Sequence, residues 1–241
     1  AEHPPNAFVP LMEDRERWTA VGNEIAAANQ QLAERRTAAK TDFDAWVANA
    51  EIAPSREIDS TLVLHLPLTD PEGPVRGLVE GESREWAANV SRIDAPLGKA
   101  PVISDAPVDL GDLGGFSRTE QVSYGGFIRV EGTPTGAVVA RMNPGQSFRG
   151  WDLYLQNGQP GAHVIDSWDK AANKIVAPTA LTSGQWHHVM VTFDGSQSGH
   201  QASAIYVDGK RANAGPYPNT VGGTIETDVP LQLGSRHGGD S

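Results

Sequence analysis

The sequence contains no cysteine among its 241 residues. This absence excludes disulfide bonds, thiolate zinc sites, iron–sulfur clusters, covalently attached haem and cysteine nucleophiles. Long apolar runs are also missing, since none approaches the roughly 18 residues that a membrane-spanning helix requires. We therefore expect a globular domain without a membrane span, in a redox compartment that the composition leaves open.

Basic residues are scarce, with 19 Lys and Arg against 30 Asp and Glu, which gives a formal net charge of −11. Binding to a phosphate backbone needs a basic stripe, so nucleic acid is excluded as a partner. The length suits one large β domain with an appendage, or two small domains. The chain begins with Ala1 and has no signal segment, so we expect a mature or excised piece.

The common catalytic signatures are absent as well. The sequence has no Gly-rich phosphate loop, no G-x-S-x-G elbow and no H-E-x-x-H motif. His187 and His188 are adjacent, so on a strand they point to opposite faces and cannot chelate one ion, which favours structural roles. Asp152 and Asp166 are candidates for a glycosidase pair, but nothing in the sequence marks them as facing each other. We predict that the protein is not an enzyme.

The N-terminal part divides by composition into an extended lead-in (1–12), a helical segment (13–50) and a linker (51–60). One apolar stripe steps by 3, 4, 3 and 4 residues, as on a helix face: Trp18, Val21, Ile25, Ala28 and Leu32. The stripe weakens at Arg35 and resumes at Phe43, after a possible cap at Thr41. This interruption predicts a helical hairpin or a kinked helix.

Short alternating or β-branched runs begin at Thr61. The candidate strands are 61–68, 122–131, 136–142, 151–156, 162–168, 173–177, 186–194, 203–208 and 229–233. Asn157-Gly158, Asp194-Gly195 and Asp208-Gly209 are typical of tight hairpin turns. The pattern predicts a mainly β, antiparallel sandwich or barrel, with residues 69–121 as long loops.

Aromatic and polar residues alternate on the central strands. In the run WDLYLQ, Trp151 shares a face with two leucines and is expected in the core, as is Trp186. Asp152 and Tyr154 then lie on the outer face. Sugars have apolar C–H faces ringed by hydroxyls, which suits aromatic rings beside polar groups. The candidate ligand-binding residues are Arg141, Arg149, Asp152, Tyr154, His163 and Trp168.

Two runs, GQWHHVMVTFDG (184–195) and SAIYVDGK (203–210), resemble the core signature of laminin-G-like, concanavalin A-like jelly rolls. The similarity extends to residues 62–70, 108–132 and 136–158. It implies a two-sheet antiparallel jelly-roll sandwich over residues 61–241. Taken together, these runs resemble the domain embedded in large planctomycete proteins that also carry a cytochrome-c-type domain and flanking domains.

The chain departs from the family pattern at two places. Phe127 stands where the family usually has Trp, which is a tolerable swap. A closing strand with a pattern like Asp-Glu-Val-Arg-Ile-Tyr is missing before Ser241. We therefore expect a truncated piece, or an end outside this sequence, with an open sheet edge prone to association.

The resemblance implies a non-catalytic carbohydrate-binding module of a larger exported protein, periplasmic or at the cell surface. Its expected partners are a polysaccharide and the flanking domains. Many relatives hold a calcium ion at a loop rim, which points to Asp70 and Asp194, although each also suits a simple turn. In the planctomycete proteins that the chain resembles, a different domain carries the haem, so no haem is expected in this chain. The alternative is a structural domain that docks onto its neighbours through the helical stripe and one sandwich face, without binding sugar.

Overall fold

The computed structural model describes residues 10–49, 61–103, 106–197, 201–213 and 219–238. The chain divides into two compact units, residues 1–57 and 58–241, and each is described on its own. The predicted linker (51–60) and most of the predicted lead-in (1–12) lie outside the described residues. Within the described ranges, no helix is both long and apolar enough to cross a membrane.

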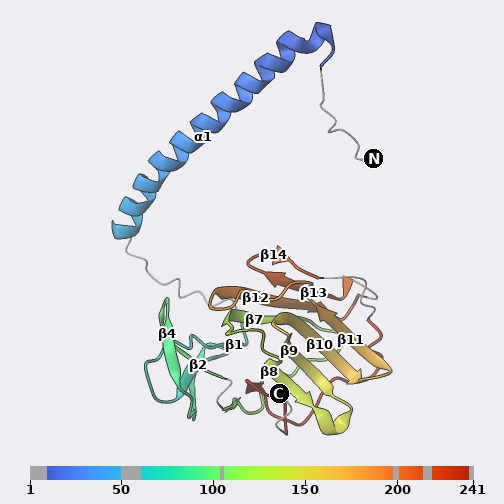
Figure 1. Ribbon diagram of the computed structural model, residues 1–241. Helices are drawn as coiled ribbons and strands as arrows, with labels where there is room; N and C mark the ends of the chain where they lie inside the picture. Colours follow the sequence, from blue (N-terminus) through green and yellow to red (C-terminus); the bar gives the residue numbers. More distant parts are fainter. Residues whose placement is uncertain (1–9, 50–60, 104–105, 198–200, 214–218, 239–241) are drawn as a thin grey trace. The chain divides into compact units, whose positions relative to one another are not determined.

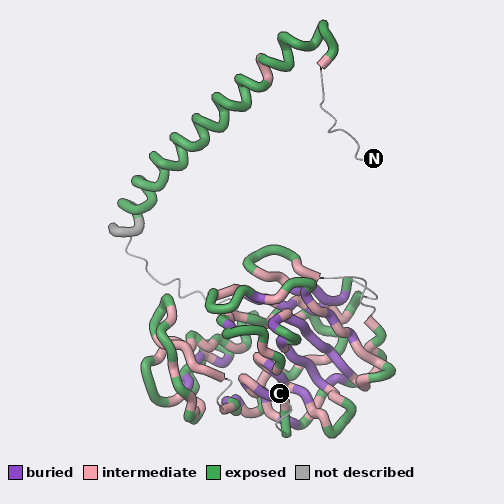
Figure 2. The backbone as a smooth tube through the Cα atoms, viewed as in Figure 1, coloured by how far each residue is buried: buried purple, intermediate pink, exposed green. Residues whose placement is uncertain are grey.

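The first unit contains one continuous helix, α1 (Arg15–Asn49), which follows a short 3₁₀ turn, η1 (Met12–Asp14). The predicted helical hairpin is wrong, because one helix runs through both Arg35 and Thr41, while the alternative of a kinked helix stays a prediction. Nothing in the later part of the helix favours a break, because that segment lacks proline and glycine and is rich in strong helix formers. An ion pair between Lys40 and Asp44 at 2.6 Å supports the same turn. Figure 2 shows the helix exposed along almost all of its length.

The second unit is built from antiparallel sheets, two of which form a sandwich (Figure 1). The six-stranded sheet has the order β11-β10-β9-β8-β15-β6 and the four-stranded sheet the order β14-β13-β12-β7. The strands of the first are β6 (Val108–Asp109), β8 (Gly136–Asn143), β9 (Arg149–Gln156), β10 (Gln159–Ser167), β11 (Ala171–Val176) and β15 (Gln232–Leu233). The strands of the second are β7 (Gln121–Arg129), β12 (Trp186–Asp194), β13 (Ser203–Val207) and β14 (Lys210–Arg211). The predicted mainly β, antiparallel fold class is confirmed.

Residues 69–121 are more regular than predicted. They hold β2 (Val75–Val79) and β3 (Glu82–Trp86), which pair with β1 (Leu64–His65) in a three-stranded sheet. A separate hairpin consists of β4 (Arg92–Ala95) and β5 (Gly98–Pro101). The β2–β3 turn uses Glu80 and Gly81, whose φ angles of 51° and 86° suit a two-residue hairpin. The long-loop prediction overlooked this Glu-Gly turn.

Two of the three predicted tight turns are confirmed. Asn157-Gly158 joins β9 to β10 with φ angles of 52° and 77°, and Asp208-Gly209 joins β13 to β14 with 51° and 75°. Asp194 instead ends β12 and accepts hydrogen bonds from the backbone N–H and the hydroxyl of Ser196. β12 and β13 are paired antiparallel, with Phe193 opposite Ser203, so the predicted two-residue turn is replaced by a longer connection.

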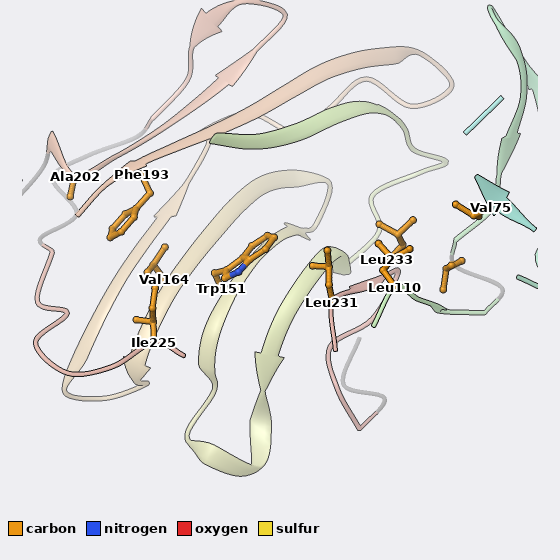
Figure 3. Packing of buried hydrophobic residues seen from close by; sticks show 10 residues of the cluster. Val75, Leu110, Trp151, Val164, Phe193, Ala202, Ile225, Leu231 and Leu233 are labelled. Atoms are coloured by element: carbon orange, nitrogen blue, oxygen red, sulfur yellow. The ribbon is translucent and has the colours of Figure 1, made fainter. Parts of the chain in front are cut away.

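The core lies between the two sheets, as Figure 3 shows for part of it. Trp151 is 6% exposed, and its indole N–H donates to the carbonyl oxygen of Gly114 at 2.8 Å, so its predicted core position is confirmed. Trp151 also packs on Tyr124 with ring centroids 4.4 Å apart. Burial raises the pKa of the Tyr124 hydroxyl well above its ordinary value.

The expectation that Trp186 belongs to the core is wrong. Along β12 the fully buried side chains are those of Val189, Val191 and Phe193, at odd positions. Trp186 opens the strand at an even position, so alternation turns it to the outer face, where it is half-buried. An apolar strand therefore does not bury every large side chain that it carries.

Candidate ligand-binding face

One row of side chains runs across the outer face of the six-stranded sheet. The strand register places Lys174 opposite His163, His163 opposite Asp152, and Asp152 opposite Ala140. Ala140 in turn lies opposite Gln232. Directly opposed residues project from the same face of a sheet, so the register alone brings these five side chains together.

Asp152 is the centre of the polar network on this face. Its side chain is fully buried, and Oδ1 accepts a hydrogen bond from the backbone N–H of His163 at 3.0 Å. The same oxygen lies 3.0 Å from Nδ1 of His163. Oδ2 accepts a hydrogen bond from Nε of Arg236 at 2.8 Å and forms an ion pair with Nη2 of the same guanidinium at 2.7 Å. A buried carboxylate needs such partners. Here the carboxylate in turn fixes the orientation of the His163 imidazole and of the Arg236 guanidinium.

Aromatic rings surround the imidazole of His163. The Tyr154 ring stacks on it with centroids 4.3 Å apart and an interplanar angle of 6°. Trp168 meets it edge-on at 5.1 Å and packs on Phe148 at 4.9 Å. The ammonium of Lys174 lies 3.4 Å from the centroid of the Trp168 ring. Partial burial lowers the pKa of the Lys174 ammonium.

The structure brings four of the six predicted ligand-binding residues together: Asp152, Tyr154, His163 and Trp168. The predicted alternation in β9 is confirmed, because Asp152 and Tyr154 lie on the face opposite Trp151. The expected open exposure of the polar pair is wrong, since Asp152 is 0% and His163 5% exposed. Arg236 and the rings of Tyr154 and Trp168 lie against them, and the contribution of Arg236 could not be foreseen from the strand itself.

The other two predicted residues, Arg141 and Arg149, lie elsewhere. Arg141 donates to the carbonyl oxygens of Leu113 and Thr227 at 2.7 and 2.9 Å and lines a cavity of about 450 Å³ beside Trp151. Its position in β8 alternates with that of Ala140, so it projects from the opposite face of the sheet. The prediction relied on proximity in sequence and therefore placed Arg141 on the wrong face of the sheet.

Arg149 forms an ion pair with Asp166 at 3.5 Å. Both positions are in phase with the core-facing residues of their strands, Trp151 and Val164, rather than with Asp152. Asp152 and Asp166 thus project from different faces of the sheet and do not form the carboxylate pair that a glycosidase would need.

Two residues of this face were not predicted from the sequence, Arg236 and Lys174. Lys174 lies in a predicted strand, and its position opposite His163 becomes evident only with the register of β10 and β11. Arg236 follows β15 in a Gly-rich stretch and carried no sequence signal. It reaches Asp152 across 84 positions of the chain.

The two predicted calcium ligands each have local partners. Asp70 pairs with Arg76 at 3.3 Å, and Asp194 accepts hydrogen bonds from Ser196 and from Gln121. Within the described ranges, no group of three or more His, Cys, Asp or Glu side chains is arranged to hold a metal ion. Calcium binding at Asp70 or Asp194 stays a prediction.

His187 lies outside this face, and its imidazole connects two segments of the chain. The backbone N–H of Thr182 donates to Nε2 of His187 at 3.1 Å, and Nδ1 lies 2.8 Å from Oδ2 of Asp208. Because Nε2 accepts, the proton of the neutral ring is on Nδ1 and points to Asp208. The imidazole thus joins the 182–187 connection to the end of β13.

Similarity to solved structures is distant. The chain is similar to the mouse laminin alpha1 chain, domains LG4-5, at 19% identity and a TM-score of 0.37, over 53% of this chain and 30% of that chain. It is also similar to the endo-beta-1,4-glucuronan lyase from the fungus Trichoderma reesei, at 16% identity and a TM-score of 0.37, over 54% of this chain and 61% of that chain. The chain therefore covers less than two thirds of either structure.

The family is identified from the sequence of the sandwich itself. A search of curated proteins found no match. Residues 104–241, more than half of the chain, match the family model described as the concanavalin A-like lectin/glucanases superfamily, Laminin_G_3. This region includes every residue of the polar and aromatic network around Asp152. The chain therefore belongs to the concanavalin A-like lectin/glucanase superfamily.

Proposed function

We propose that the protein is a non-catalytic polysaccharide-binding module and that its ligand binds to the outer face of the six-stranded sheet. We call this surface the Asp152 face and define it by Asp152, Tyr154, His163, Trp168, Lys174 and Arg236. The observation that carries the proposal is the buried Asp152 carboxylate, which holds His163 and Arg236 in fixed positions beside two partly exposed aromatic rings.

The chemistry of this face suits a sugar. Flat rings such as Tyr154 and Trp168 offer apolar surface for the C–H face of a pyranose. The guanidinium of Arg236, which stays 15% exposed, offers hydrogen bonds for the sugar hydroxyls, and its fixed orientation lowers the entropic cost of binding. Membership of a superfamily that includes lectins supports this ligand class.

Lys174 imposes a condition on this mode of binding. Its ammonium lies over the Trp168 ring, so a sugar that stacks on the same side must displace it. A cation–π contact of this kind contributes about 0.5–1 kcal/mol at an exposed site, which a ligand contact can replace. We therefore expect Lys174→Met, which removes the ammonium and keeps the apolar stem, to change affinity without abolishing binding.

The absence of catalysis is part of the proposal. Both oxygens of Asp152 are engaged, by His163 and by Arg236, and Asp166 projects from the other side of the sheet. General acid–base work on a glycosidic bond requires two carboxyl groups across one cleft. The Asp152 face offers one carboxylate, and that one is buried.

Affinity electrophoresis through acidic and neutral polysaccharides tests the proposal. We expect one class to retard the full chain, and Trp168→Ala or Tyr154→Ala to remove the retardation. Trp18→Ala is the matched control, because Trp18 is an exposed aromatic residue on α1. If no polysaccharide retards the chain, or if Trp168→Ala and Trp18→Ala migrate alike, the proposal is wrong.

A second candidate function is docking onto flanking domains of a larger protein, as the resemblance to planctomycete cytochrome-c-associated proteins suggested. The observation in its favour is the spacing of Trp18, Ile25 and Leu32 on α1, which remain 61%, 56% and 49% exposed. Absence of retardation by any polysaccharide, together with capture of a flanking domain that Trp18→Ala prevents, would favour this function. Export to the periplasm or cell surface belongs to the same proposal.

A further inference from the structure

β7 is a nine-residue strand at the edge of the four-stranded sheet, and it pairs only with β12. The hydrogen bonds between β12 and β13 show which backbone N–H and C=O groups of β7 point away from the sheet. Asp194 donates its backbone N–H to Ala202, and His188 accepts at its backbone carbonyl from Asp208, so even positions of β12 face β13. Odd positions of β12 therefore face β7. In an antiparallel ladder these groups alternate, so the outward edge belongs to every second residue of β7.

The residues that present backbone groups at this edge are the odd ones: Gln121, Ser123, Gly125, Phe127 and Arg129. All five are exposed, whereas the even residues between them are half-buried. In the part of the chain that the structure describes, no other backbone group pairs with this edge. β7 thus offers a continuous row of unpaired N–H and C=O groups.

Nothing in β7 blocks pairing with another strand. Protected edges usually carry proline, lysine or a bulge, or are very short. β7 has neither proline nor lysine, and its register with β12 is continuous. Its one charged residue, Arg129, is the last of the strand and pairs with Glu131 at 2.6 Å. At the opposite edge of the same sheet, β14 is only two residues long. The unprotected edge of this sheet is therefore β7, the longer of its two edge strands.

We propose that β7 pairs with β7 of a second copy of this chain, antiparallel and across a two-fold axis at Gly125. In antiparallel pairing through the outward groups, odd residues must lie opposite odd residues. A two-fold axis at Gly125, which is the central residue of β7 and an odd position, meets this requirement. Ser123 then lies opposite Phe127 of the partner subunit, and Gln121 lies opposite Arg129 of the partner subunit. Each such pair exchanges two backbone hydrogen bonds, and the two four-stranded sheets become one.

Side chains in this register are compatible. Phe127, which is 71% exposed, gains cover from the neighbouring strand. Arg129 meets an amide rather than another cation, so no like charges face each other. On the inner face, Val122 lies opposite Ile128 of the partner subunit, which extends the apolar layer across the axis. Glycine at the centre lets the two backbones approach without side chains between them.

Sedimentation of the full chain with a matched pair of variants tests the interface. Ser123→Lys adds a charge at the edge, whereas Thr192→Lys adds the same charge on the directly opposed residue of β12, away from the edge. We expect wild type and Thr192→Lys to form dimers and Ser123→Lys to lose them. A wild-type chain that stays monomeric at its highest soluble concentration, or equal loss in both variants, would overturn the proposal.

Cross-linking tests the register, because the chain has no cysteine of its own. Opposed residues of a hydrogen-bonded pair lie about 5.5 Å apart between Cα atoms, within the range of a disulfide. Ser123→Cys combined with Phe127→Cys should give covalent dimers on oxidation, whereas either change alone should not, since identical positions then lie several residues apart. Circular dichroism confirms that the variants fold. Failure of the double variant, or cross-linking of a single one, would contradict this register.

The dimer and the polysaccharide proposal fail independently. The β7 edge belongs to the four-stranded sheet and the Asp152 face to the six-stranded sheet. Ser123→Lys should therefore keep retardation by polysaccharide when a single chain engages the ligand, while Trp168→Ala should keep the dimer.

Discussion

Asp152 and Arg236 form a buried ion pair between residues 84 positions apart in the chain. The carboxylate is wholly buried, while 15% of the Arg236 side chain remains exposed. The same carboxylate also holds His163. One pair thus fastens the stretch after β15 to the outer face of β9 and β10.

Asp152→Ala should destabilise the fold by about 3–5 kcal/mol, because it leaves a largely buried guanidinium without its anion. Asp152→Asn keeps an acceptor for the backbone N–H of His163 and should be less destabilising. Urea unfolding at neutral pH measures both variants. An alanine variant within about 0.5 kcal/mol of wild type, the range of ordinary surface changes, would show that this network does not hold the face together.

Gly161→Ala should move Tyr154 without unfolding the protein. Gly161 lies directly opposite Tyr154, and a Cβ atom there would overlap the phenol ring. The ring must leave its stack on His163, so retardation by polysaccharide should fall by an amount close to that for Tyr154→Ala. Unchanged retardation would show that the stacked position of the ring is not needed for binding.

Stability in acid should depend on Asp208. The hydrogen bond from His187, followed by that from the backbone N–H of His188, lowers the pKa of this carboxyl below its usual value. A lowered folded pKa stabilises the fold fully above the unfolded value of about 3.9, and the stabilisation is lost as pH falls through the folded pKa.

Asp208→Asn should therefore be less stable than wild type at neutral pH, and the two unfolding curves should converge in acid. Asp228→Asn is the matched control, because Asp228 is exposed and makes no ion pair within the described ranges. Unfolding free energies measured from neutral pH down to about pH 3, just below that unfolded value, test this. Parallel curves for wild type and Asp208→Asn would contradict it.

Gly125 and Gly126 should respond differently to alanine, although they are adjacent in β7. A Cβ atom at Gly125 would overlap the backbone carbonyl oxygen of Val189, whereas one at Gly126 would meet nothing within 4 Å. Gly125→Ala should destabilise by about 1–3 kcal/mol. Gly126→Ala should be neutral, or stabilising by up to about 1 kcal/mol, because it removes unfolded-state entropy. Urea midpoints at one protein concentration compare them, and equal midpoints would contradict the close approach of the two strands.

The sandwich could be predicted from local sequence because its signals are local. Period-two alternation placed Trp151 inward and Asp152 outward, and the Asn157-Gly158 and Asp208-Gly209 turns formed as expected. Both depend on side-chain direction and φ preference within a few residues. Two of the missed strands between 69 and 121, β3 and β4, are short and polar, so their alternation was weak, whereas β2 alternates clearly and was overlooked.

The fold class, the family and the shared face of the β9 side chains were predictable without the structure, because they depend on patterns within single strands. Tertiary structure alone decided that Arg236 covers Asp152, that Lys174 lies on Trp168, and that Arg141 belongs to another face. The physical reason is register: alternation fixes the face on which a side chain lies, but only strand pairing and distant loops fix its neighbours.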